Sequence, residues 1–195
     1  MRPPAILLIT HPEVVIDPAV PVPDWPLSPL GRARTALFAV EPALGGVARI
    51  VSSAERKARD TAAILAQALG LTAEVEPALH ENNRSATGFL PPAEFERVAD
   101  AFFARPEESV RGWERAVDAQ ARVVEAVRRI DRGTPPGSSL AVVAHGGVGA
   151  LLMAHAMAVP ISRRLDQPGA GGGNWFLLER GSLALRTGWR AMPRP

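Results

Sequence analysis

Hydrophobic residues along this chain gather in short continuous runs, separated by longer stretches with helical spacing. The first run, "AILLIT" at residues 5–10, is too short for a helix and predicts a strand buried on both faces. The segment "NWFLLERGSLALRTGW" at 174–189 predicts a hairpin that turns at Arg180 and Gly181. Further strands are predicted at 47–53, 72–79 and 139–144.

Helical patterns lie between these strands. Ser28 followed by Pro29 is typical of a helix start, and predicts a helix over 28–39. The strongest pattern is "SSAERKARDTAAILAQALG", in which we expect Ser52 and Glu55 to form a capping box and Gly70 to end the helix. Other helices are predicted at 92–104, 113–130 and 147–158. Strands that alternate with helices indicate an α/β fold with a mostly parallel sheet.

The length of 195 residues suits one domain with a sizeable core. We therefore interpret residues 1–195 as a single domain, with a helical elaboration at about 80–115. Apolar residues make up 47% of the chain and charged residues 22%, as in ordinary globular proteins.

The charge pattern gives little support to a nucleic-acid partner. The isoelectric point of about 10.2 is high, but the formal net charge is only +2. With no Cys, no Tyr and a single Lys, few groups titrate between His and Arg, so a small basic excess raises the isoelectric point far. The chain also lacks a Lys/Arg block with interleaved aromatic residues.

The absence of cysteine and of long apolar runs indicates in which cellular compartment the protein is expected. The absence of cysteine excludes disulfides and thiolate metal sites, and fits a reducing compartment. The apolar run before His11 is too short for a signal-peptide core, and no stretch approaches the roughly 18 residues that span a membrane. We therefore expect a cytoplasmic protein without a membrane or nucleic-acid partner.

Polar side chains that can take part in catalysis or binding follow the predicted strands. In parallel α/β sheets, ligands bind beyond the carboxyl ends of the strands. His11 and His145 each follow a buried strand directly. The other strands lead to Ser52, Ser53 and Lys57, and to His80 and Glu81. These four strand ends are expected to form one site.

Phosphoryl transfer by covalent catalysis fits these residue types better than metal chemistry. The chain has no HxH or HExxH pattern, and its loops are poor in Asp. Imidazole is a nucleophile that can take a phosphoryl group and release it to water. Lys57 is the only lysine, and near a helix N-terminus its compact charge suits a phosphate, although a solvated surface lysine is the simpler alternative.

Five motifs in the same order resemble the histidine phosphatase superfamily, whose best-known members are cofactor-dependent phosphoglycerate mutases and small phosphomonoesterases. "ITHPEV" stands for the Arg-His-Gly motif of the family and "LSPLGRARTA" for its Leu-Thr/Ser-x-x-Gly segment. "SSAERKARDTA", "LHENNRSATG" and "AHGGVGALLMAH" match the remaining three motifs. The order and spacing hold over nearly the whole chain.

The resemblance implies a three-layer α/β/α sandwich, phosphoglycerate mutase-like, and a phosphatase that needs no metal or other cofactor. It assigns His11 as the phosphorylated nucleophile, His145 as the second phosphate-pocket histidine and Glu81 as the acid/base carboxylate. Gly146, in the last motif, is expected to contact phosphate. The substrate would be a small phosphorylated molecule. A phosphatase is favoured over a mutase because the sequence shows no tailored second pocket.

Two residues depart from the family pattern. Thr10 replaces the arginine before the nucleophile and Pro12 replaces the glycine after it. Loss of that arginine removes a charge-assisted contact worth roughly 1.5–3 kcal/mol. Thr10 would donate one hydrogen bond in its place, and Arg84, three residues after Glu81, would supply a cation or pair with a surface carboxylate. The alternative function is a catalytically decayed protein that binds a phosphorylated metabolite or a protein partner.

Four further features are interpreted from their position in the chain. His80 is expected to contact the substrate. His155, in an apolar helix, is expected to pack against its neighbours or to lie at the surface. The proline-rich segment around Trp25 is expected to wall one side of the site. Phe89, Phe102 and Phe103 are expected to form the core of the elaboration at 80–115.

Overall fold

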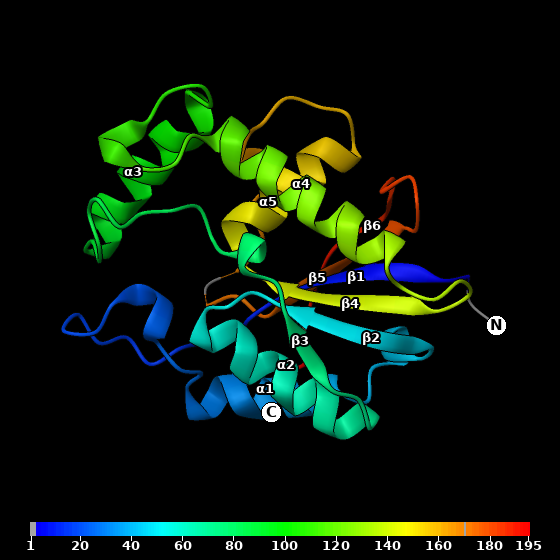
Figure 1. Cartoon of the computed structure of the whole chain (residues 1–195). Helices are drawn as coiled ribbons and strands as arrows, with labels where there is room; N and C mark the ends of the chain where they lie inside the picture. Colours follow the sequence, from blue (N-terminus) through cyan, green and yellow to red (C-terminus); the bar gives the residue numbers. More distant parts are fainter. Residues whose placement is uncertain (1–2, 170) are drawn as a thin grey trace.

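The computed structural model describes residues 3–169 and 171–195, and shows a central sheet between two layers of helices (Figure 1). Six strands form this sheet in the described part of the chain: β1 (Ala5–Thr10), β2 (Val47–Ser52), β3 (Ala73–Val75), β4 (Ser139–Ala144), β5 (Asn174–Glu179) and β6 (Leu185–Ala191). Their order is β3-β2-β4-β1-β5-β6. The first four are parallel, whereas β5 runs antiparallel to β1 and to β6. The mostly parallel sheet and the closing hairpin are confirmed.

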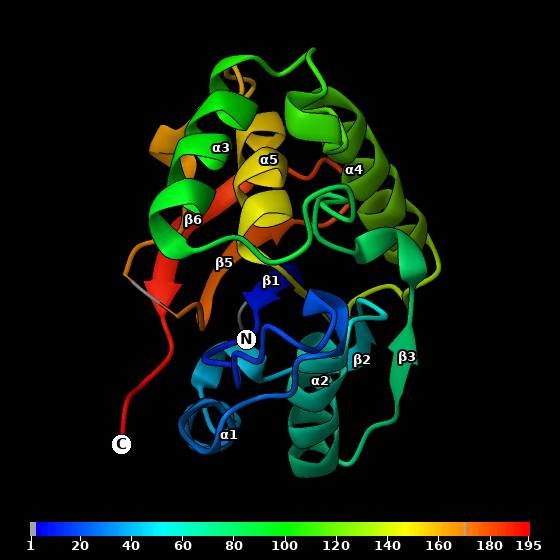
Figure 2. The same ribbon diagram turned by 90° about the vertical axis from the view of Figure 1, so that its left-hand side faces the viewer.

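Helices cover both faces of the sheet, which confirms the three-layer arrangement (Figure 1, Figure 2). α1 (Pro29–Phe38) and α2 (Arg56–Leu69) lie on one face, and α4 (Ala116–Arg132) and α5 (Gly146–Ala156) lie on the other. β1 is buried at all six positions because its alternate side chains enter two different cores. Leu7 packs with Phe38 of α1, and Leu8 packs with Val127 of α4.

The helix ends bear out two of the predicted signals and correct a third. The Ser28 side chain accepts a hydrogen bond from Gly31 N at 3.1 Å, and Gly70 ends α2 with φ of 67°. The predicted capping box of Ser52 and Glu55 is wrong. Ser52 belongs to β2, and Glu55 is itself the N-cap residue with no side-chain cap bond. Its carboxylate is engaged elsewhere, in the site described below.

Two other boundaries differ from the sequence patterns. The strand predicted at 72–79 is only Ala73–Val75, because Pro77 starts a 3-10 turn at Pro77–Leu79 and has no N–H for the sheet. The helix predicted from residue 113 begins at Ala116.

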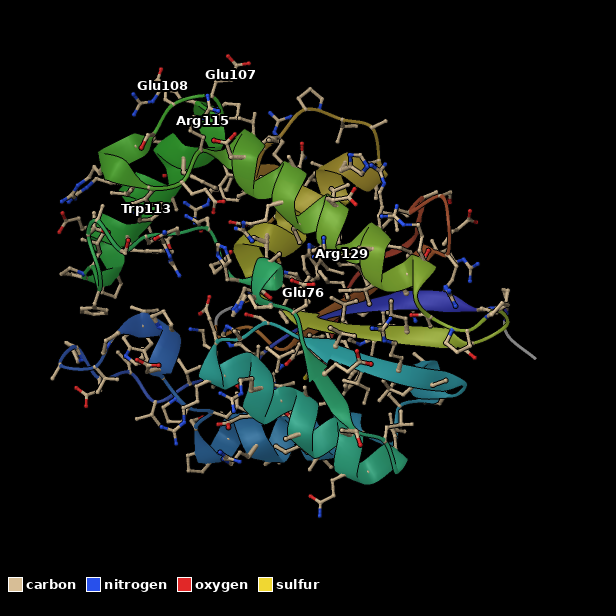
Figure 3. The ribbon with its side chains drawn as sticks, viewed as in Figure 1. Glu76, Glu107, Glu108, Trp113, Arg115 and Arg129 are labelled. Carbon is tan, nitrogen blue, oxygen red and sulfur yellow. The ribbon has the colours of Figure 1, made fainter. Side chains whose placement is uncertain are left out.

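The elaboration at 80–115 contains α3 (Pro92–Ala104), which packs beyond α5 (Figure 2). Phe102, Phe103 and Trp113 form an apolar cluster with Leu151 of α5 (Trp113 is labelled in Figure 3). Phe89 does not join this cluster: it is half-buried, and its ring lies 5.8 Å from that of Trp25. None of the helices in residues 3–169 and 171–195 is long and apolar enough to cross a membrane.

A buried arginine joins the loop after β1 to the segment before β5. The Arg34 guanidinium, on α1, donates to Glu13 Oε1 at 2.7 Å and to the carbonyl oxygens of Gly172 and Gly173 at 3.2 and 3.1 Å. The residue is 1% exposed. Its fork of donors satisfies several buried acceptors at once.

We expect Arg34→Ala to lower the free energy of unfolding by about 3–5 kcal/mol, because it leaves Glu13 and two buried carbonyl groups without their donor. Arg32→Ala is the matched control on the same helix. The Arg32 side chain is 49% exposed and pairs with Asp60 at the surface, so its loss is expected to cost less than about 1 kcal/mol. Urea unfolding of both variants checks this, and equal losses would contradict it.

Candidate active site

The pairing of β1 with β4 brings two histidines together. Thr10 lies opposite Ala144 in the parallel register, so the next residue of each strand, His11 and His145, emerges at the same sheet edge. The two ring centroids are 5.3 Å apart and the planes are inclined at 66°. His11 N donates to Ala144 O at 3.3 Å, which extends the strand pairing to the histidine itself.

One ring nitrogen of His11, Nδ1, is hydrogen-bonded to the backbone, whereas Nε2 is not part of that bond. Its Nδ1 lies 2.9 Å from Pro12 O, and a carbonyl only accepts, so Nδ1 carries the hydrogen. In neutral imidazole this leaves the lone pair on Nε2. Burial, followed by the Lys57 charge, lowers the pKa of His11 to about 4. The His11 imidazole is therefore uncharged at neutral pH, with a lone pair on Nε2.

A glycine segment supports His11 from behind. Gly173 N donates to His11 O at 3.0 Å. A Cβ on Gly172 would lie 2.3 Å from the same oxygen, and the φ of Gly172 is +75°. Only glycine allows the backbone to approach this closely in that conformation.

His145 is almost completely enclosed, at 1% exposure. Its Nε2 lies 2.9 Å from Ser53 Oγ and 3.4 Å from Glu55 Oε1. Burial lowers the pKa of His145 to about 3, against the opposing influence of the Glu55 charge. The second histidine is therefore also neutral at pH 7.

A buried Glu55–Lys57 ion pair lies beside the histidines. Lys57 Nζ is 2.5 Å from Glu55 Oε2 and donates to Val22 O at 2.8 Å. Only 5% of the Lys57 side chain is exposed, so the surface interpretation of this residue is wrong. Burial alone raises the pKa of Glu55, but the Lys57 charge and the hydrogen bonds that the carboxylate accepts outweigh this and hold the pKa below its ordinary value.

Glu55 was not predicted as a site residue. The sequence signal for it is an acidic residue two positions before the only lysine, at a strand-to-helix turn that faces the site. The same glutamate also fits a capping box, and that interpretation assigned it to the helix end instead.

The carboxylate of Glu81 lies at the N-terminus of α5, the helix that begins directly after His145. Its carboxylate oxygens accept from Gly147 N and Val148 N, both at 2.9 Å. Its own backbone N donates to Glu55 Oε1 at 2.9 Å, so the two acidic residues are directly linked. Carboxylates are favoured at a helix N-terminus, where backbone N–H groups are unpaired.

Two arginines of α4 hold the segment that carries Glu81. Arg122 donates to His80 O at 2.9 Å and pairs with Glu114 at 2.7 Å. Arg129 pairs with Glu76 at 2.7 Å, at the other end of this segment (both are labelled in Figure 3). Sequence analysis identified neither arginine, because each acts through a contact between distant parts of the chain.

Thr10 is fully buried, and its hydroxyl is already engaged. It donates to Gln167 Oε1 at 2.7 Å and accepts from Asn174 N at 2.9 Å. The expectation that this hydroxyl faces a phosphate is therefore corrected: it joins β1 to the segment before β5. Gly146 begins α5, where a Cβ would lie 2.2 Å from Gln167 Nε2.

Arg84 is held by aromatic rings. Its guanidinium lies 5.0 Å from the Phe95 ring centroid and 5.6 Å from that of Trp113. Its charge contributes to lowering the pKa of His11. His155, by contrast, contacts Arg128 at 3.1 Å on the last turn of α5, away from the paired histidines.

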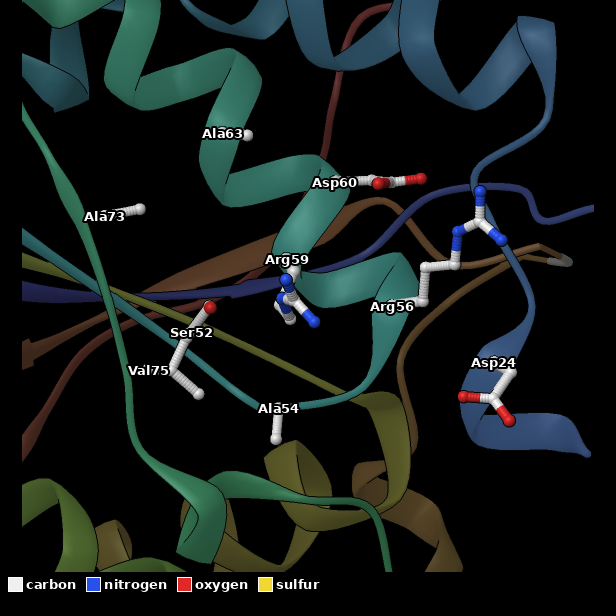
Figure 4. A pocket seen from close by; sticks show the side chains of 9 residues that line it. All are labelled: Asp24, Ser52, Ala54, Arg56, Arg59, Asp60, Ala63, Ala73 and Val75. Atoms are coloured by element: carbon white, nitrogen blue, oxygen red, sulfur yellow. The ribbon is translucent and has the colours of Figure 1, made fainter.

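Two hollows lie near the strand ends. The larger, of about 740 Å³, is lined by Glu55, His80, Glu81 and Arg84, and on its opposite wall by the proline-rich segment 18–23. The proline-rich segment thus lines one side of this hollow, as expected from its position in the sequence. The smaller hollow, of about 460 Å³, lies between β3 and the start of α2, where Figure 4 shows Arg56 and Arg59. Neither His11 nor His145 is among the residues that line either hollow.

Comparison with known proteins finds the same fold in phosphatases. The family model described as histidine phosphatase superfamily (branch 1) matches residues 6–181. The structure is similar to mycobacterial glucosyl-3-phosphoglycerate phosphatase, with 25% identity, a TM-score of 0.81 and coverage of 97% of this chain and 100% of that chain. "Mycobacterial hydrolase 1" gives 25% identity, a TM-score of 0.77 and full coverage of both chains. YhfR of Bacillus stearothermophilus, at 22% identity and a TM-score of 0.77, covers 94% of both and shows the fold alone. No curated relative matches the chain.

The lowered histidine pKa values predict an acid-sensitive fold. In the unfolded chain a histidine titrates near 6.5, so between that pH and about 4 the unfolded state binds more protons than the folded state. We therefore expect the free energy of unfolding to fall by about 1–2 kcal/mol per buried histidine between pH 7 and pH 5. Urea unfolding of native protein and His11→Gln at both pH values measures this. The same fall in both proteins would contradict the assignment to His11.

Proposed function

Because the chain belongs to the histidine phosphatase superfamily, we propose that it is a metal-independent phosphomonoesterase that acts through a phosphohistidine at His11. The observation that carries this proposal is the pair of neutral imidazoles at 5.3 Å, one with Nδ1 bonded to Pro12 O. That bond leaves the Nε2 lone pair of His11 for attack on phosphorus. The superfamily and the similar structures at 25% identity support a phosphatase at this coarser level.

The proposed reaction has two steps. His11 Nε2 attacks phosphorus, the N–P bond forms and the bond to the leaving oxygen breaks, while Glu81 donates a proton to that oxygen. Water then attacks the phosphohistidine as Glu81 takes its proton, and phosphate leaves with His11 restored. The location of Glu81 on the cleft wall supports its role as acid and base.

Donors around the strand ends would stabilise the phosphoryl oxygens. In this proposal His145 and Lys57 supply a ring N–H and a positive charge, and the N-terminus of α5 at Gly146 supplies a backbone N–H. Arg84, on the cleft wall, is the second cation. Thr10 contributes only by fixing the end of β1. A small phosphorylated substrate, phosphatase rather than mutase chemistry and a cytoplasmic location complete the proposal.

Two observations favour the alternative of a decayed protein that only binds a phosphorylated ligand or a protein partner. The Lys57 charge is already balanced by Glu55, and the Thr10 hydroxyl is committed to Gln167 and Asn174. Both reduce the attraction for phosphate compared with the family pattern. The two functions differ in whether a phosphoryl group leaves the ligand.

Hydrolysis of para-nitrophenyl phosphate between about pH 5 and 8 tests the enzyme. We expect turnover that survives EDTA and falls at least about a thousandfold in His11→Ala, since that substitution removes the nucleophile. His155→Ala is the matched control, because it also removes an imidazole, and we expect it to keep native turnover. If folded native protein binds vanadate but releases no nitrophenol, the decayed binding protein is supported instead.

Glu55→Gln tests the balance of charge in the site. The amide keeps the shape of the carboxylate but releases the Lys57 charge, so we expect inorganic phosphate to bind about tenfold more tightly. Calorimetric titration with phosphate measures this. Weaker binding in Glu55→Gln would show instead that the ion pair orients Lys57 for phosphate. Glu74→Gln, at an exposed pair with Arg49, is the control and leaves phosphate affinity unchanged.

A further inference from the structure

The larger hollow has an apolar side and a polar side. Its first wall is the segment Pro18–Pro23, and its second runs from His80 to Phe89. Glu81, the acid of the proposed reaction, is part of the lining, and so is Glu55, whose Oε1 lies 3.4 Å from His145 Nε2; His11 and His145 themselves do not line the hollow. With about 740 Å³ it has room for an organic group well beyond the phosphate.

We propose that this hollow binds the leaving group of the substrate, and that this group is an uncharged alcohol with a largely apolar body and one polar substituent. The inference rests on the phosphatase function proposed above. It names the class of ester that the same site accepts.

The apolar wall is fixed before any ligand binds. Trp25 is buried, and its indole Nε1 donates to Asp17 O at 2.9 Å and to Val20 O at 3.0 Å. The Phe89 ring lies 5.8 Å from the Trp25 ring, which joins the two walls. Five prolines or valines in the segment 18–23 add stiff apolar surface: Pro18, Val20, Pro21, Val22 and Pro23. Such a surface binds an apolar body without loss of loop entropy.

The charges of the lining argue against an acidic leaving group. Glu55 and Glu81 line the hollow together with Arg84. Glu55 and Lys57 balance each other as an ion pair, which leaves the opposite charges of Glu81 and Arg84. The lining therefore has no excess positive charge for a leaving group with its own carboxylate or second phosphate, whose desolvation would go uncompensated.

A buried amide provides the polar contact. Asn82 is 6% exposed and lines the hollow, and its Nδ2 has no hydrogen-bond partner among the described residues. An unpaired buried donor is costly, and a hydroxyl, carbonyl or ether oxygen on the leaving group would satisfy it. This contact distinguishes a substituted apolar alcohol from a plain hydrocarbon.

Three phosphate esters of primary alcohols test the inference: benzyl phosphate, glycerol 3-phosphate and 3-phosphoglycerate. All three release a primary alkoxide, so differences in kcat/KM report mainly binding of the leaving group in the transition state. We expect benzyl phosphate to exceed both others by at least about tenfold, and 3-phosphoglycerate to be the slowest. Benzyl phosphates with a carbamoyl group at the 3 or 4 position are expected to gain further, and to lose that gain in Asn82→Ala.

Substitutions of Phe89, in the wall of the hollow, test whether this wall sets the preference among esters. Phe89→Ala is expected to lower kcat/KM for benzyl phosphate about tenfold and to change that for glycerol 3-phosphate less than twofold. Phe89→Leu keeps an apolar wall if the alanine variant unfolds, and retains most of the preference. Val40→Ala, at a position that is 84% exposed and outside the lining, is the control and changes neither ester.

The outcomes separate this inference from the function on which it rests. If folded protein releases phosphate neither from these esters nor from para-nitrophenyl phosphate, the phosphatase proposal is overturned. If it hydrolyses all of them, but kcat/KM for glycerol 3-phosphate or 3-phosphoglycerate equals or exceeds that for benzyl phosphate, the phosphatase proposal stands and the leaving-group inference is overturned. An equal loss for every ester in Phe89→Ala and Phe89→Leu would overturn it as well.

Discussion

The parallel register of β1 and β4 is the constraint on which the rest of the site depends. Because Thr10 lies opposite Ala144, the two residues that follow are both histidines at one sheet edge. A shift of one residue would turn each side chain to the other face and bury apolar residues in the wrong core. The two apolar layers on either side of β1 therefore fix the distance between His11 and His145.

Electrostatics in this protein is arranged around neutral groups and balanced pairs. The histidines are uncharged because their surroundings, enclosed around His145 and half-buried around His11, disfavour the imidazolium form, and the single lysine is buried only together with Glu55. Isolated charges in such a setting would be strongly unfavourable, whereas a hydrogen-bonded pair is tolerated. The site is consequently close to electrical balance, so under the proposed function an arriving phosphate dianion would disturb it. Glu55 lies at the centre of this balance, since it contacts Lys57, His145 and the backbone of Glu81.

Sequence patterns predicted what depends on neighbours in the chain, and missed what depends on distant contacts. The buried strand at 5–10, the Ser28 cap and the position of His11 and His145 after their strands follow from local spacing and from the geometry of parallel sheets. The pattern Ser-x-x-Glu at Ser52 looks the same whether or not the serine caps a helix, and only the pairing of β2 decides that it does not. The roles of Arg34 and Arg122 could not be predicted, because their acceptors lie tens of residues away and include backbone oxygens that carry no sequence signal.

The central position of β1 also governs the order in which the protein can fold. β1 lies between β4 and β5, and Ala5 N bonds to Ser139 Oγ, 134 residues further along the chain. During synthesis this strand is made before both of its strand partners, β4 and β5, and it cannot pair in the sheet until β4 at Ser139–Ala144 has been made. Long-range pairing of this kind makes folding slow and leaves apolar segments exposed to aggregation in the meantime. The two histidines can therefore meet only after β4 has been made and has paired with β1.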